Sequence, residues 1–147
     1  MEDWLEKPKT VLRWSGLKAR PNHAGHLIGI GELAESGTGI TIPGFTLQIE
    51  VKAPCDVARC LYLFSIMHQQ AGDRRRAYQL EVSPAGKRTH NGDDQPIHGP
   101  HEHVDDDVFA VSDSAVKCEN WSGALHWFFT RTHIEPFEIP DPNRDGL

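Results

Sequence analysis

Strict alternation of apolar and polar residues marks the stretch FTLQIEV, residues 45–51. This period of two predicts a strand with one buried and one solvent-facing side. The stretch CLYLFSIM, residues 60–67, is apolar at both odd and even positions and predicts a central strand covered on both faces. AYQLEV, residues 77–82, alternates again, so residues 60–82 predict an antiparallel hairpin with a long loop at 69–75. The apolar positions of the first strand are Phe45, Leu47, Ile49 and Val51.

Shorter apolar stretches predict further strands at residues 10–16, 27–33, 101–104 and 108–112. Gly29 and Gly31 weaken the second of these, because glycine has no side chain to pack in a sheet.

Helical periodicity is clear only in residues 117–134. Apolar residues recur there at the spacing of one helix face, with Asn120 as the expected N-cap and Glu135-Pro136 as the expected stop. The members of this apolar stripe are Trp121, Ala124, Leu125, Phe128 and Phe129.

Together these elements predict an α+β fold, a mostly antiparallel sheet with one substantial C-terminal helix packed on it. The alternative is a small β-roll or barrel with the helix as a plug. A length of 147 residues predicts a single domain. The first few residues and about 140–147 are expected to fray.

Composition narrows the classes of function. The net charge of −6 argues against a general nucleic-acid binder of the basic kind. No apolar run is long enough to span a membrane, and the stretch MEDWLEKPKT lacks the apolar segment of a signal peptide. Cys55, Cys60 and Cys118 are an odd number without a secretion signal, so we expect reduced thiols, no disulfide and a cytoplasmic protein.

The segment PIHGPHEHVDDD, residues 96–107, contains three of the nine histidines and three consecutive aspartates. On a strand, His101 and His103 project to the same face, where two imidazoles can bind one transition metal such as Zn²⁺. A third ligand has to come from elsewhere, and Asp105 completes the predicted set. The other candidates for that position are His90, His98, Asp106 and His126.

Two other interpretations of this segment stay open. Without a metal, His90, His101 and His103 could act as acid and base in RNA cleavage, with Arg75 and Arg88 contacting phosphate. The simpler interpretation is an exposed polar strand that leads into a solvated acidic turn.

The segment RTHNGDDQPIHGPHEHVDD resembles a feature of some small bacterial and phage proteins, in which a strand hairpin precedes a His-Asn-Gly turn and then Pro and His-x-His. The TumE-like proteins of toxin–antitoxin loci are similar in size and carry a related segment. The resemblance covers about residues 76–112 and implies a mobile-element or defence-related context. The positions that fit are His90, Asn91, Gly92, His101 and His103.

The leading hypothesis is therefore a small cytoplasmic protein whose histidine segment cleaves RNA phosphodiesters. The rival hypothesis is a non-catalytic module, such as an antitoxin, immunity or inhibitor protein, whose acidic surface meets a cognate protein partner. Convergence of His90, His101 and His103 would favour the enzyme, and scattered histidines would favour the binding module.

Overall fold

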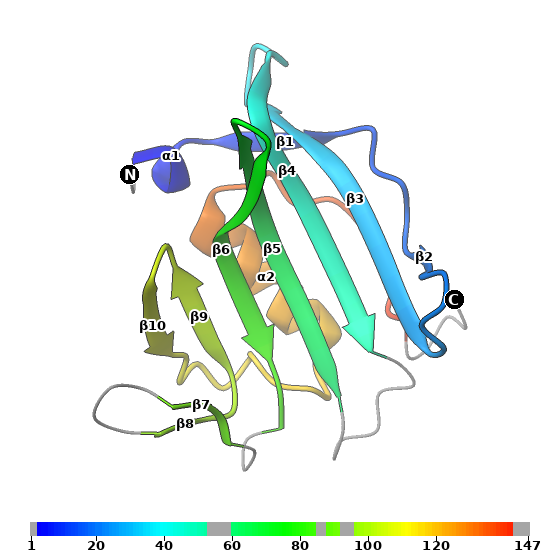
Figure 1. The fold of residues 1–147 in the computed structure, drawn as a ribbon, viewed down its shortest axis with the longest axis vertical. Helices are drawn as coiled ribbons and strands as arrows, with labels where there is room; N and C mark the ends of the chain where they lie inside the picture. The colour runs from blue at the N-terminus through cyan, green and yellow to red at the C-terminus, as the bar shows by residue number, and fades with distance from the viewer. Residues whose placement is uncertain (1–2, 53–59, 85–87, 92–95, 143–147) are drawn as a thin grey trace.

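The computed structural model describes residues 3–52, 60–84, 88–91 and 96–142. Eight strands form one antiparallel sheet in the order β1-β3-β4-β5-β6-β9-β10, with β2 beside β3, and β7 and β8 form a separate pair (Figure 1). The elements are α1 (Asp3–Glu6), β1 (Lys9–Leu12), β2 (Lys18–Ala19), β3 (His26–Glu35), β4 (Thr41–Lys52), β5 (Leu61–Gln70), β6 (Asp73–Val82), β7 (Arg88–Asn91), β8 (Pro96–His98), β9 (His101–Val104), β10 (Asp107–Ala110) and α2 (Trp121–Thr132).

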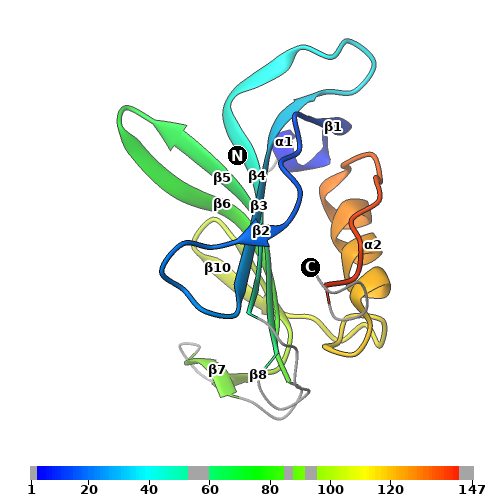
Figure 2. The ribbon, with the colours of Figure 1, turned by 90° about the vertical axis from the view of Figure 1, so that its right-hand side faces the viewer.

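The helix α2 covers one face of this open sheet (Figure 2). The predicted α+β class is confirmed, and the sheet is open rather than closed into a barrel. We call the face toward α2 the inner face and the opposite face the outer face. Figure 2 also shows that the far end of the β5–β6 hairpin bends away from α2.

The core lies between α2 and the inner face. Phe64 of β5 contacts two members of the predicted helix stripe, with ring centroids 5.4 Å from Phe128 and 5.5 Å from Trp121. All five stripe residues are buried, as predicted. Leu47, Ile49 and Val51 are buried too, whereas Phe45 is half-buried and stacks on His68.

On the outer face, β5 is covered less completely than predicted, because α2 lies only on the other side. Leu63 and Met67 are half-buried there. This face is therefore where side chains of the central strands can meet solvent.

The β5–β6 hairpin is tighter than predicted. Its turn is Ala71-Gly72, and both residues have positive φ, 53° and 81°, as a two-residue hairpin turn requires. The strands consequently extend to Gln70 and from Asp73. The predicted loop at 69–75 is wrong at both ends, because residues 69–70 belong to β5 and residues 73–75 to β6.

The N-terminal end of α2 follows the prediction, and the C-terminal end does not. Asn120 is the N-cap, and its side chain accepts a hydrogen bond from the Gly123 backbone N–H. At the other end the helix stops at Thr132, because His133 takes the left-handed conformation with φ 57°. Its N–H still bonds the last turn, so the helix ends before Pro136 is reached.

Gly29 and Gly31 strengthen β3 packing instead of weakening it. A Cβ on Gly29 would collide with the indole of Trp14, and one on Gly31 would lie 2.6 Å from Val11 Cγ1. The absence of a side chain lets Trp14 lie against the strand.

A disulfide joins Cys60 to Cys118, with the two Cα atoms 6.0 Å apart. The prediction of no disulfide was wrong, since it rested on the odd number of cysteines and on an expected cytoplasmic location. The pairing follows from tertiary packing: Tyr62, two residues after Cys60, donates a hydrogen bond to the Cys118 carbonyl (2.6 Å). The cysteine argument for a reducing compartment no longer applies, and a cytoplasmic location stays a prediction. Cys55 lies outside the described residues.

None of the helices in the described ranges has the length and apolar character needed to cross a membrane.

Candidate metal centre

Antiparallel pairing of β6 with β9 brings three polar side chains together on the outer face. Glu81 pairs with His101, and Gln79 pairs with His103. Side chains alternate along each strand, so Leu80 between the two β6 residues joins the core on the inner face. Glu81, His101 and His103 therefore all project from the outer side of the sheet.

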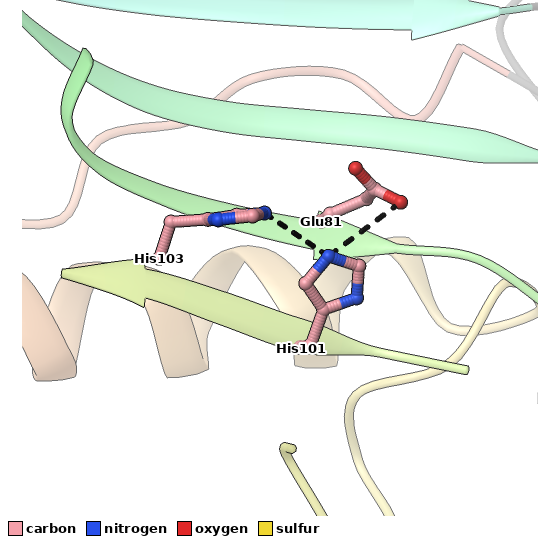
Figure 3. Close-up of side chains that lie close together, drawn as sticks. All are labelled: Glu81, His101 and His103. Carbon is pink, nitrogen blue, oxygen red and sulfur yellow. Dashed lines mark hydrogen bonds and ion pairs between the residues drawn. The ribbon is translucent and has the colours of Figure 1, made fainter. Parts of the chain in front are cut away.

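The three side chains converge, as Figure 3 shows. His101 Nε2 lies 3.1 Å from His103 Nε2 and 3.8 Å from Glu81 Oε2. Each residue offers one ligand atom, and these three atoms all lie within 4.8 Å of one another. These are three donors, two nitrogens and one carboxylate oxygen, gathered around one point.

The cluster is largely shielded from solvent. His101 is 1% exposed and His103 is 5% exposed, whereas the Glu81 side chain is 20% exposed. Solvent therefore reaches the cluster mainly on the Glu81 side. The interpretation of residues 101–104 as an exposed polar strand was wrong, because all four residues are buried.

A backbone carbonyl orients the His101 ring. Its Nδ1 lies 3.2 Å from the carbonyl oxygen of Gly99, and that residue has φ 74°, a turn conformation natural to glycine. An Nδ1–H that donates to this carbonyl leaves Nε2 as the acceptor nitrogen, on the side of Glu81 and His103. Metal-binding histidines typically have such a partner on their second nitrogen.

Glu102, between the two histidines, points to the inner face and anchors β9 there. Its Oε2 accepts a hydrogen bond from the Tyr78 hydroxyl (2.8 Å) and one from Arg131 Nε of α2 (3.2 Å). Burial and then the neighbouring Glu102 carboxylate raise the pKa of Tyr78 well above its ordinary value. Tyr78 thus stays a neutral donor, and Glu102 holds β9 against β6 and α2.

The structure brings the predicted pair His101 and His103 together, but the third residue of the cluster is Glu81, which was not predicted. Asp105 follows β9 with φ 54°, in the turn before β10, and it is not part of the group. Because Asp105 lies in this turn, it does not follow the strand alternation that places the two histidines on one face. His126 is exposed on α2, across the sheet from the outer face.

Two predicted phosphate contacts and two further histidines lie elsewhere. Arg75 is on β6, where it is highly exposed and bonds Asp73 (2.8 Å). Arg88 and His90 are on β7 and His98 is on β8, but their side chains lie outside the described part of the chain. The expected convergence of His90 with the pair stays a prediction.

Glu81 is the member that sequence reasoning missed. The alternation of AYQLEV does place it on a polar face. Its partner strand, however, lies beyond the β7–β8 pair, and only the β6–β9 register puts it opposite His101.

The geometry suits a tetrahedral ion. Zinc bonds of about 2.0 Å to two imidazoles place the nitrogens about 3.3 Å apart, and the observed separation is 3.1 Å. The Glu81 carboxylate has to move toward the nitrogens, because its oxygen lies 3.8 Å from His101 Nε2 and the group spans up to 4.8 Å; its partial exposure leaves room for that movement. Two histidines and a glutamate are a known ligand set of catalytic zinc, and the same set with open positions also suits ferrous iron.

Comparison of the chain with protein-family models, curated proteins and solved structures found no match. The resemblance to the TumE-like proteins stays a prediction from the histidine segment.

Proposed function

We propose that the protein binds one divalent transition-metal ion, Zn²⁺ in the first instance, through Glu81, His101 and His103. The observation that carries this proposal is the convergence of the three ligand atoms within 4.8 Å on a single sheet face. Two features support it further: the Gly99 carbonyl orients His101, and the ligands come from two paired strands of a rigid sheet.

Charge favours a cation at this position. Glu81 brings a carboxylate to a position that is largely shielded from water, and negative charge in such a position is costly unless it is compensated. A divalent ion supplies that compensation and satisfies all three donors at once.

We propose further that the bound ion serves metal-assisted hydrolysis, with RNA phosphodiesters as the substrate class to test first. Three protein ligands leave a coordination position for water or substrate, and zinc there would polarise a phosphoryl oxygen and lower the pKa of a bound water. The chain's own part is to hold the ligands, with Gly99 fixing one ring and Glu102 fixing the strand.

Zinc titration calorimetry at neutral pH tests the metal site. Wild-type protein, first stripped of metal by a chelator that is then removed, should bind one Zn²⁺ per chain. Glu81→Gln should weaken the affinity by at least about tenfold, because an amide oxygen replaces an anionic ligand. No wild-type binding tighter than about millimolar would contradict the proposal.

Glu50→Gln is the matched control for that titration. Glu50 lies in the same cross-strand row, through Leu63, and its side chain is 19% exposed, but it pairs with Arg20 instead of the histidines. Its substitution should leave zinc affinity within about twofold of wild type. Equal losses in both variants would show a general effect of outer-face charge.

Cleavage of a single-stranded RNA oligonucleotide tests the reaction. The zinc-loaded wild type should cleave it, and both a chelator and Glu81→Gln should abolish cleavage. Cleavage that survives the chelator would favour acid–base chemistry by the histidines alone. Zinc binding without cleavage would favour the binding module with a protein partner, for which the net charge of −6 is the supporting observation.

A further inference from the structure

Three consecutive arginines on β6 differ in the face they occupy. The register shifts between Ile66 and Met67, so that Ala77 is an extra residue and Arg76 pairs with Met67. Met67 and Ser65 lie two residues apart on β5, so their side chains project from the same face. Ser65 pairs with Gln79 on the outer face. The bulge therefore returns Arg76 to the outer face, whereas its neighbour Arg75 has the opposite parity.

A hydrogen bond links the Arg76 head group to Gln79, the strand neighbour of the proposed metal ligands on the outer face. Arg76 Nη1 donates to Gln79 Oε1 (3.1 Å), and Gln79 is the direct cross-strand partner of His103. The other end of the Gln79 amide is fixed, because its Nε2 donates to the buried Ser65 hydroxyl (2.8 Å). Directly opposed residues on neighbouring strands have Cβ atoms about 5 Å apart, so the residue that Arg76 bonds is the immediate cross-strand neighbour of a cluster member.

Of the three arginines, only Arg75 has a carboxylate partner in the described part of the chain, whereas Arg74 and Arg76 each bond a neutral glutamine amide. Arg75 is paired with Asp73 at 2.8 Å, and Arg74 bonds Gln48. Arg76 is exposed, and within the ranges that the structure describes it has no carboxylate partner. A guanidinium carries five N–H donors, and Gln79 takes one of them.

We propose that Arg76 is the anion-binding residue of the metal centre and that the group it recognises is a phosphoryl group of the substrate. This inference rests on the proposed metal function, because the cluster attracts an anion only when it holds a cation. With a divalent ion on Glu81 and the two histidines, the centre carries a net charge of +1, and Arg76 adds a second positive charge and a fork of donors suited to phosphate.

Neighbouring aspartates make this recognition conditional on the metal. Arg76 also lines a groove of about 570 Å³ together with Arg75, Asp105 and Asp106. The two carboxylates repel anions, so phosphate should bind only where Arg76 and the ion act together. Arg76 thus takes the role that was predicted for Arg75 and Arg88.

Inorganic phosphate titrated into the Co²⁺-loaded protein tests the inference, with the visible spectrum of the cobalt ion as the readout. Phosphate should change the wild-type spectrum, and Arg76→Gln should weaken phosphate affinity about tenfold or more, as expected for a lost charged hydrogen bond. Cobalt affinity should stay within about twofold in that variant, because no metal ligand is changed. The control, Arg75→Gln, should retain wild-type phosphate affinity.

The possible failures are distinguishable. Failure of the wild type to bind Co²⁺ overturns the metal proposal and this inference with it. Normal cobalt binding with equal phosphate affinities in wild type and Arg76→Gln overturns this inference alone. Equal losses in the Arg76 and Arg75 variants also overturn it, since they would indicate a general charge effect. Phosphate binding to the metal-free protein as tight as to the cobalt form would separate the anion from the metal centre and contradict the inference.

Discussion

Removal of the Cys60–Cys118 disulfide should cost the protein a large part of its stability. The bond closes a loop of 58 residues. For a loop of that length, the chain-entropy relation gives the unfolded state about 14 cal/mol/K of additional entropy when the bond is absent, or about 4 kcal/mol at 25 °C. Since small domains have free energies of unfolding of about 5–15 kcal/mol, the double variant Cys60→Ala/Cys118→Ala should be marginally stable.

Equilibrium unfolding in denaturant under non-reducing conditions measures this loss. We expect the double variant to lose about 3–5 kcal/mol, because two buried sulfurs are removed as well. Cys55→Ala is the control and should retain both the disulfide and the stability of the wild type. Three free thiols per denatured wild-type chain, or a loss below about 1 kcal/mol in the double variant, would refute the reasoning.

Further predictions concern the core and one buried cation. Phe128→Ala should lower the free energy of unfolding by about 3–5 kcal/mol in a denaturant melt, because Phe128 is fully buried against Phe64. Gly29→Ala should lower it by about 1–3 kcal/mol, because the added methyl group displaces Trp14. Burial lowers the pKa of Lys9 from 10.5 to about 8. The unfolded chain then binds more protons between these two pKa values, so the free energy of unfolding should rise from about pH 8 to 10.5. Lys9→Met should remove that rise in denaturant melts across this range.

Local patterns predicted those parts of the fold that depend on neighbours in sequence. Alternation at 45–51 identified the central part of β4, and the stripe from Trp121 to Phe129 identified the face of α2 that packs on the sheet. The Asn120 cap was predictable for the same reason, since its partner Gly123 is three residues away.

The errors arose where the outcome depends on residues far apart in the chain. The disulfide joins positions 58 residues apart that only the packing of the segment before α2 brings together. His101 and His103 likewise lie on a strand with neighbours β6 and β10 on its two sides, and this place inside the sheet cannot be inferred from the two histidines. A motif of two histidines showed where the candidate site lies but not how deeply it is buried.

The third ligand was hidden for a related reason. Glu81 and His101 become neighbours through one register of β6 against β9, and a shift of one residue would send Glu81 to the opposite face. The bulge at Ala77 has the same effect on the arginines, because it decides which of Arg75 and Arg76 shares the face of the histidines. Neither register nor bulge leaves a clear mark in a single sequence.

A crystal structure of the protein with saturating Zn²⁺, with the ion located by anomalous scattering at the zinc edge, tests the central claim most directly. We predict one ion bonded to His101 Nε2, His103 Nε2 and a Glu81 carboxylate oxygen, at about 2.0–2.2 Å. The Nδ1 of His101 should keep its contact with the Gly99 carbonyl. An empty cluster at saturating zinc, or an ion held only by other residues, would contradict the claim.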